Sequence, residues 1–256
     1  THVIVSAVGL LLTLISAVLT VLAWLLIGES LQKPDRYATD PHRIAANCLE
    51  IVMRPDSISF ALLAAVIFGG FFAYITLIPF IAIDTFGLSA ADGGWLVGLN
   101  GVALWSGAVF NNRKSGRWPV RRLLRLSTGI ALGASLAALA TTLAASLGLV
   151  GGTLGLVLIA APSMLYCLTF GITQPNSIVM SLQPVPHVAG VASALGATLQ
   201  MACAALLTWL AGLMYNGTPV ALGICLSATA IFSFLMFTLV AVKYTPGDAA
   251  ARARHA

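Results

Sequence analysis

The chain has 256 residues and a formal net charge of +5, and 59% of its residues are hydrophobic while only 8% are charged. A soluble globular domain carries roughly 25% charged residues, so this composition, with a mean hydropathy of +0.97, excludes an ordinary water-soluble protein. It predicts an all-α integral membrane protein, and the basic residues flank apolar runs, which does not indicate a nucleic-acid partner.

Seven apolar runs are long enough to cross a membrane, because a spanning helix needs about 20 mostly apolar residues. They cover residues 3–27, 58–82, 93–111, 123–147, 152–180, 189–214 and 219–242. The chain begins with Thr1, and its first run is too long for the core of a signal peptide. We therefore expect this run to be a membrane span whose upstream sequence is missing.

These runs predict four parts. Residues 1–28 form a transmembrane helix, residues 29–57 a cytoplasmic loop, residues 58–243 a six-helix transmembrane domain, and residues 244–256 a cytoplasmic tail. Within the loop, Asp40-Pro41 suits the start of a helix. An apolar stripe opposite Arg43 and Glu50 predicts a short amphipathic helix on the inner membrane surface. The stripe consists of Ile44, Cys48, Leu49, Ile51 and Val52.

The basic residues predict the orientation. All 13 Lys and Arg residues lie within 33–54, 113–125 and 243–254, and the 117 residues from Leu126 to Val242 carry no charge. The loops after the first and third runs and the tail are therefore basic, while Asp84 and Asp92 lie on the other side. Cytoplasmic loops carry the excess of Lys and Arg, so we expect the C-terminus in the cytoplasm and the start of the chain outside.

Polar side chains occur in only four of the seven runs. Asn, Gln and Tyr inside the runs are Tyr74, Asn100, Tyr166, Gln174, Asn176 and Gln200. Such groups usually face a bundle interior or a water-filled cavity, so the second, third, fifth and sixth runs are expected to line an interior and the others to be peripheral. Hydrogen bonds between helices are the alternative for each residue. Glycine pairs at 94/98, 129/133 and 151/155 predict close helix packing.

Other functional classes lack their motifs. The four cysteines form no C-x-x-C pair, and no histidine in a span has a second ligand near it, so a metal site is not expected. No phosphate-binding G-x-x-x-x-G-K loop is present. Ser89 and Asp92 fit a helix-capping box. Apart from Arg125 at the start of the fourth run, no acidic or basic residue is predicted inside a span. An ion-coupling group is therefore expected in the missing N-terminal sequence or not at all.

The segment GAVFNNRKSGRWPVRRLLRL, residues 107–126, resembles the cytoplasmic loop between the eighth and ninth helices of the major facilitator superfamily. That loop is a degenerate copy of the superfamily's signature, with a glycine, a polar turn and clustered arginines. Asparagine replaces the usual aspartate, so a gating salt bridge is not expected here. The matching residues are Gly107, Asn111, Arg113, Arg117, Arg121 and Arg122.

Further segments resemble the bicyclomycin/chloramphenicol-resistance (Bcr/CflA) drug-efflux branch. Residues 72–100 resemble its seventh and eighth helices, residues 171–200 its tenth and eleventh, and Gly28-Glu29-Ser30-Leu31 the end of its sixth. The resemblance implies a chain made of the sixth helix and the C-terminal half of a twelve-helix transporter. In that family the seventh, eighth, tenth and eleventh helices border the central cavity.

The implied function is secondary active export of small amphipathic drugs or metabolites across the bacterial inner membrane, with no enzymatic step and no cofactor beyond a coupling proton. Its partners would be membrane lipid, the exported molecule and the missing N-terminal half. Transport of another metabolite, a seven-helix receptor and a non-transporting remnant remain as alternatives. The implied cavity wall consists of Phe68, Phe72, Tyr74, Asn100, Tyr166 and Gln200.

Overall fold

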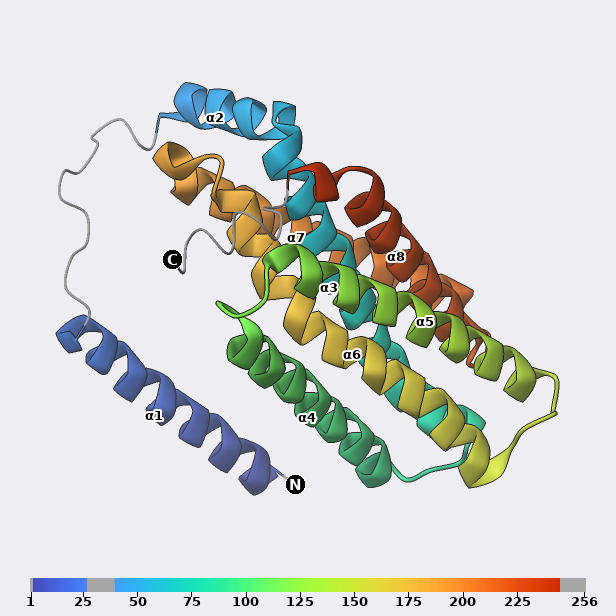
Figure 1. Ribbon diagram of the computed structural model, residues 1–256. Coiled ribbons are helices and arrows are strands. Elements are labelled where there is room, and N and C mark those ends of the chain that lie inside the picture. Colours follow the sequence, from blue (N-terminus) through green and yellow to red (C-terminus); the bar gives the residue numbers. More distant parts are fainter. Residues whose placement is uncertain (1, 27–39, 245–256) are drawn as a thin grey trace. The chain divides into compact units, whose positions relative to one another are not determined.

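The computed structural model describes residues 2–26 and 40–244. Three regions of the sequence analysis lie outside this part: Gly28 to Leu31, the loop that carries Lys33 and Arg36, and the basic tail. The described chain is helical, with short turns and one isolated bridge, and seven of its helices are long and apolar enough to cross a membrane. The prediction of an all-α membrane protein with seven spans is therefore confirmed (Figure 1).

The helices follow the predicted runs closely. They are α1 His2–Leu26, α2 Pro41–Met53, α3 Pro55–Phe80, α4 Ala90–Lys114, α5 Val120–Ser146, α6 Gly152–Leu182, α7 Ala189–Met214 and α8 Val220–Leu239. Three short helices supplement them: the π-helix η1 Ile81–Thr85 and the 3-10 helices η2 Pro186–Val188 and η3 Ala241–Lys243. The described residues before Ile44 and those from Ile44 onward belong to two separate units.

Local chemistry explains where the helices begin and end. The Ser89 hydroxyl accepts a hydrogen bond from the Asp92 backbone N–H at 3.2 Å and contacts the Asp92 carboxylate at 2.6 Å, which confirms the predicted cap. Asp40 Oδ1 likewise accepts the backbone N–H of His42 at 3.0 Å, before α2. The chain turns after α7 at Gly217, whose φ of +83° is readily accessible only to glycine.

The far end of α3 differs from the prediction. The apolar run was expected to end at residue 82, yet the helix continues without a break as η1 to Thr85 and so includes Asp84. Pro79 lies inside α3 just before this change, and proline removes a backbone hydrogen-bond donor, which favours irregular helical turns nearby.

Within the unit from Ile44 onward, α3 and α6 form the centre of a six-helix bundle. α3 packs against α6, α7 and α8, while α6 also packs against α4 and α5. α4 and α7 expose most of their surface, with 17% and 11% of their apolar segments buried, against 44% to 61% for the other four helices. Of the four helices predicted to line an interior, α3 and α6 are thus interior to this bundle, whereas α4 and α7 form its most open faces.

Close helix packing occurs mainly at other glycines than the predicted pairs, of which Gly155 alone has a near contact, with the Phe86 ring at 3.1 Å. Nothing lies within 4 Å of a Cβ built at Gly94, Gly98, Gly129, Gly133 or Gly151, so the predictions for the pairs 94/98 and 129/133 are wrong within this bundle. Gly107 and Gly171 instead hold α4 against α6, because a Cβ at Gly171 would lie 2.5 Å from the carbonyl oxygen of Leu104. Spacing alone could not reveal this, since it does not specify which way a helix face points.

The short helix α2 confirms the predicted element in the loop. Ile51 is buried and packs with Val185, just before η2, and with Ala192 in the first turn of α7. Glu50 Oε1 lies 3.1 Å from His187 Nε2. Leu49 and other apolar residues of the predicted stripe remain exposed. The position of α2 on a membrane surface stays a prediction.

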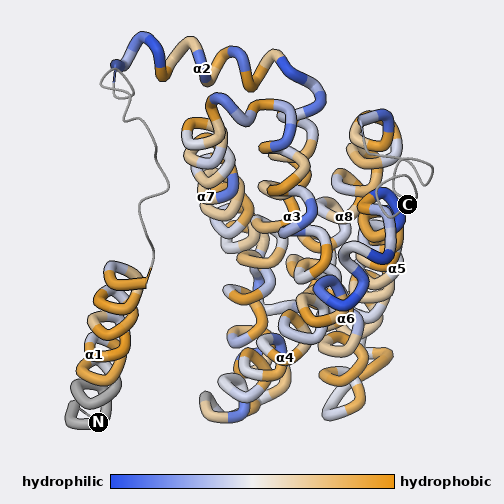
Figure 2. The backbone as a smooth tube through the Cα atoms, turned by 60° about the vertical axis from the view of Figure 1, so that its left-hand side comes forward, coloured by the Kyte–Doolittle hydropathy of each residue, from blue (hydrophilic) through white to orange (hydrophobic). Residues whose placement is uncertain are grey.

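Charge separates the two ends of the bundle. The helices alternate in direction, so the start of α3, the α4–α5 connection and the end of α8 share one end, which carries Arg54, residues 113–125 and Lys243. Asp84 and Asp92 lie at the opposite end, at the end of η1 and the start of α4. Figure 2 shows hydrophobic colour along the long helices and hydrophilic colour on α2 and at helix ends.

Candidate functional site

Four phenylalanines from α3 and α6 stack together near the middle of both helices. Phe71 and Phe170 are parallel with ring centroids 4.5 Å apart, and Phe68 stacks on Phe72 at 4.7 Å. The two pairs touch at 6.1 Å between Phe68 and Phe170. Phe72 is 37% exposed, whereas Phe170 is 8% exposed. The stack therefore reaches from the bundle core to its surface.

Two amide side chains extend this stack on α6 and α7. Gln174 lies one helical turn after Phe170, hence on the same side of α6, and its Nε2 donates to Gln200 Oε1 at 2.7 Å. Gln174 Oε1 is buried and has no hydrogen-bond partner in the described part of the chain. We call Phe68, Phe71, Phe72, Phe170, Gln174 and Gln200 the aromatic–amide cluster. It combines flat apolar surface with unused hydrogen-bonding capacity and carries no charge.

The predicted wall residues do not all reach this cluster. Phe68, Phe72 and Gln200 belong to it. Tyr166 is fully buried, and its hydroxyl lies 3.0 Å from Thr229 Oγ1 of α8. That contact is the interhelical hydrogen bond of the alternative interpretation, and it leaves Tyr166 no surface for a ligand in this structure.

Tyr74 and Asn100 form a second buried polar pair. Both are almost inaccessible, at 0% and 3% exposure, and they are near neighbours on α3 and α4. The Asn100 amide donates to the Leu96 carbonyl at 2.8 Å within its own helix. Tyr74 Oη and Asn100 Oδ1 nevertheless have no hydrogen-bond partner among the described residues. A ligand role for this pair stays a prediction, because neither group is open to the surface here.

Sequence reasoning missed Phe71, Phe170 and the place of Gln174 in the cluster. The segment from Phe68 to Phe72 does carry a signal, because aromatic residues at i and i+4 meet on one helix face. The partner ring on α6 has no comparable signal, since the pairing depends on how α3 and α6 are rotated against each other.

The signature-like segment is divided between a helix, a turn and the next helix. Gly107 lies inside α4, where a Cβ would clash with the Leu168 carbonyl oxygen, so its role is helix packing. Asn111 lies one turn later and accepts a 2.6 Å hydrogen bond from Asn176 Nδ2 of α6. Asn176 also donates to the Ile172 carbonyl at 2.6 Å. Two neutral amides thus join α4 to α6 at the position of the expected aspartate.

The arginines of this segment surround Trp118. The Arg122 guanidinium lies 4.1 Å from the Trp118 ring centroid and Lys114 Nζ lies 4.9 Å from it. Arg113 and Arg117 are exposed on the end of α4 and on the turn, and Arg121 is half-buried at the start of α5. No ion pair of these side chains with a carboxylate occurs within residues 40–244.

At the opposite end, the α7–α8 turn is joined to η1. The Tyr215 hydroxyl donates to Asp84 Oδ2 at 3.0 Å, and the Thr85 hydroxyl donates to the Gly217 carbonyl at 3.2 Å. Partial burial, with the Asp84 carboxylate beside it, raises the pKa of the Tyr215 hydroxyl. Asp84 therefore has a hydrogen-bond partner within the bundle.

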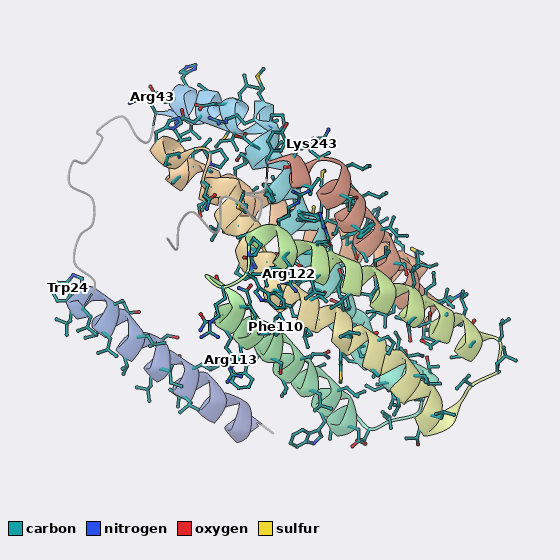
Figure 3. All side chains as sticks on the ribbon, in the orientation of Figure 1. Trp24, Arg43, Phe110, Arg113, Arg122 and Lys243 are labelled. Carbon is teal, nitrogen blue, oxygen red and sulfur yellow. The ribbon has the colours of Figure 1, made fainter. Side chains whose placement is uncertain are left out.

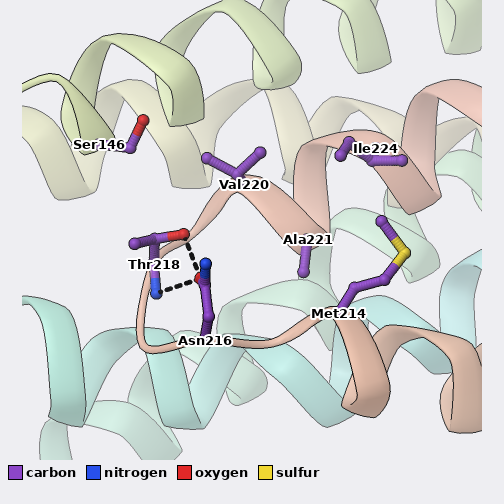
Figure 4. A pocket seen from close by; sticks show the side chains of 7 residues that line it. All are labelled: Ser146, Met214, Asn216, Thr218, Val220, Ala221 and Ile224. Atoms are coloured by element: carbon purple, nitrogen blue, oxygen red, sulfur yellow. Dashed lines mark hydrogen bonds between the residues drawn. The ribbon is translucent and has the colours of Figure 1, made fainter.

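A small cavity of about 380 Å³ lies beside the same turn (Figure 4). Asn216 Oδ1 accepts the Thr218 hydroxyl at 2.7 Å and its backbone N–H at 3.3 Å, which shapes the turn. The other lining side chains include Met214, Val220 and Ile224, so the cavity gathers no catalytic or metal-binding groups. Within the described residues, no three His, Cys, Asp or Glu side chains gather at any point.

Comparison with known proteins finds membrane transporters. The family model described as Major Facilitator Superfamily matches residues 2–208. An uncharacterized MFS-type transporter, YdgK, from Bacillus subtilis is 29% identical over 178 residues, which are 70% of this chain and 42% of that protein. A bicyclomycin resistance protein homolog from Haemophilus influenzae is 21% identical over 231 residues, which are 90% of this chain and 56% of that protein. No solved structure matches this chain significantly.

The chain spans about half the length of these curated relatives. The matched residues nevertheless include α1 and most of α7 in a single stretch.

Proposed function

Because this chain belongs to the major facilitator superfamily of membrane transporters, we propose that it forms the sixth helix and the C-terminal half of a secondary active exporter of small amphipathic molecules. In transporters built from repeated halves, the halves rock against each other around a site near the middle of the bilayer. One half contributes one wall of that site.

The observation that carries this proposal is the aromatic–amide cluster. It lies near the middle of α3, α6 and α7, where a midplane site is expected, and Phe72 reaches the bundle surface. Flat rings bind varied apolar groups, while the Gln200 amide offers hydrogen bonds with adjustable geometry. Such a surface suits neutral amphipathic molecules, in keeping with the name of the relative described as a bicyclomycin resistance protein homolog.

The face that meets the other half would be formed by α4 and α7. These two helices bury the least of their apolar segments within this bundle, although they flank its centre. The other half would cover part of this surface and close the site. The acid that carries the coupling proton would belong to that half, because the acidic residues of the described spans lie at helix ends.

The basic end of the bundle would face the cytoplasm of a bacterial inner membrane. The arginines and lysine at the α4–α5 connection, with Asp84 and Asp92 at the opposite end, support this orientation. A single cysteine introduced at Ser115 should react with an impermeant thiol reagent only in inverted vesicles. Labelling only from the outside of intact cells would reverse the orientation.

The export proposal is tested with the full-length protein that contains this chain, expressed in a drug-sensitive bacterial strain. Phe72→Ala and Gln200→Ala should each lower export or change the drug spectrum. An aromatic contact or hydrogen bond to a ligand is worth ~0.5–1.5 kcal/mol, which corresponds to roughly a 2- to 13-fold change in affinity. Export has to be normalised to the amount of folded protein in the membrane.

Thr141→Val on α5 is the matched control. The Thr141 hydroxyl bonds only to the carbonyls of Ala137 and Ala138 in its own helix, at 3.0 Å each. Its removal should therefore leave ligand binding unchanged. If both cluster variants export every tested drug as well as this control does, the cluster is a packing feature and the site lies elsewhere.

A further inference from the structure

A larger cavity of about 910 Å³ opens at the basic end of α4, away from the aromatic–amide cluster. One part of its lining is apolar and comes from the last turns of the span: Trp105, Val109 and Phe110. The other part is basic and comes from the end of the helix and the following turn: Arg113, Lys114 and Arg117. We call this the α4-end cavity. Its lining is apolar along the span and becomes basic at the end of the helix.

The basic part is held in place by the turn that follows α4. The backbone N–H groups of Arg117 and Trp118 both donate to the Lys114 carbonyl, at 3.0 and 2.9 Å. Gly116 allows this with a φ of +84°, which favours glycine. Lys114 and Arg122 lie against the two-ring face of Trp118, and Phe110 contacts the same ring edge to face at 5.9 Å. Of the cations that line the cavity, Lys114 is therefore held by its ring contact and Arg117 is placed by the backbone of the turn before any ligand arrives.

Among the residues that the structure describes, these cations have no partner of opposite charge. Residues 107–126 contain no Asp or Glu. Within residues 40–244, Arg54 pairs with Asp56 and His187 with Glu50, and both pairs lie away from this cavity. Several cations held close together repel one another unless an anion lies between them. In addition, Arg121 of this segment, which does not line the cavity, has its Nε buried without a hydrogen-bond partner in the described chain.

We propose that the α4-end cavity binds an anionic phospholipid, with the headgroup phosphate between Arg113, Lys114 and Arg117 and an acyl chain along Trp105 and Val109. Guanidinium and ammonium groups are the usual protein partners of phosphate. A free phosphate ion would use only the basic part of the cavity, whereas an amphiphile uses both.

The position of the cavity matches the depth at which headgroups lie. The span Ala91–Lys114 ends at the cavity, so its basic residues lie at the boundary between hydrocarbon and water. Tryptophan, arginine and lysine gather at this boundary in membrane proteins, and basic pockets at helix ends recognise anionic headgroups. Figure 3 shows Phe110 and Arg113 on this end of α4 and Arg122 at the start of α5.

The proposal is tested by mass spectrometry of the intact full-length protein, released from detergent after titration with phosphatidylglycerol or phosphatidylcholine. Phosphatidylglycerol should bind with a defined stoichiometry, and sodium chloride should weaken it, while phosphatidylcholine should bind weakly. A basic residue at an anionic membrane surface contributes about fivefold to binding. The double variant R113Q/R117Q should therefore bind phosphatidylglycerol roughly 30-fold more weakly.

The double variant R125Q/K243Q is the matched control, because it removes two exposed cations from the same end of the bundle without touching the cavity lining. It should retain phosphatidylglycerol within about twofold, since charges outside the site are screened by salt. Unchanged size-exclusion profiles and helical circular dichroism have to accompany both variants. W105A, which keeps all the charges, should also weaken the lipid complex if the acyl chain lies along this ring.

Three results would overturn the proposal. Equal losses in the two double variants would mean that only the overall surface charge attracts the lipid. Displacement of phosphatidylglycerol by millimolar glycerol phosphate, with no effect of W105A, would assign the cavity to a soluble phosphate ester. Absence of any stoichiometric lipid complex in the full-length protein would mean that another part of the protein fills the cavity.

Discussion

Replacing Gly171 with alanine tests how closely α4 and α6 approach each other. A Cβ at this position would lie 2.5 Å from the Leu104 carbonyl oxygen and 2.7 Å from the Ala108 backbone nitrogen. Carbon and oxygen atoms normally stay about 3.3–3.6 Å apart, so the two helices would have to separate by roughly 0.8–1.1 Å. Both obstructing atoms belong to the backbone, which cannot change rotamer to make room.

The expected cost follows from overpacking. Extra methyl groups in a well-packed interior cost about 1–3 kcal/mol, partly offset here because alanine is better than glycine in a helix by up to ~1 kcal/mol. Separation of the helices would also strain the 2.6 Å hydrogen bond between Asn111 and Asn176, one turn away. Gly133→Ala on α5 is the control, because nothing lies within 4 Å of its Cβ. It should be neutral or slightly stabilising.

The assay is reversible unfolding of the purified full-length protein, followed by circular dichroism as sodium dodecyl sulfate is added to mixed micelles. Gly171→Ala should be less stable than Gly133→Ala by about 1–3 kcal/mol. Equal stability of the two variants would refute the backbone contact between α4 and α6. It would then leave the pair Gly129/Gly133 as a possible packing site.

Further predictions concern tyrosines. Tyr166→Phe should lower the free energy of unfolding by ~0.6–1.7 kcal/mol, because it removes the hydrogen bond to Thr229. Tyr74→Phe should be neutral or stabilising, because the Tyr74 hydroxyl has no partner in the described chain. The same unfolding assay checks both, and equal losses would contradict the different roles given to the two hydroxyls. The raised pKa of Tyr215 means that its bond to Asp84 is intact at neutral pH and is lost as pH rises past the ordinary tyrosine value of about 10. Thermal unfolding temperature should therefore fall more steeply above that pH in the wild type than in Tyr215→Phe, and parallel pH profiles would exclude the link.

The sequence by itself determined the membrane class, the number of long helices and the end of the bundle at which charge gathers. Transfer of an apolar run into lipid depends on the composition of that run alone, so each span can be found without knowledge of its neighbours. The Ser89 cap is local for the same reason, because donor and acceptor are three residues apart. The predicted helix ends are accordingly close to the observed ones, except at η1, where the π-helical continuation has no periodic signal.

The tertiary structure decided which residues meet. The polar residues of the spans were known, but only the rotation of each helix about its axis shows that Tyr166 bonds to α8 while Gln174 and Gln200 join α6 to α7. Glycine spacing likewise named candidates for close packing, yet Gly107 and Gly171 are the residues at which backbones touch. Helix rotation is set by the sum of many weak contacts with partners distant in the chain, and each contact depends on all the others. A local pattern therefore fixes that a helix exists, whereas packing fixes what each of its faces touches.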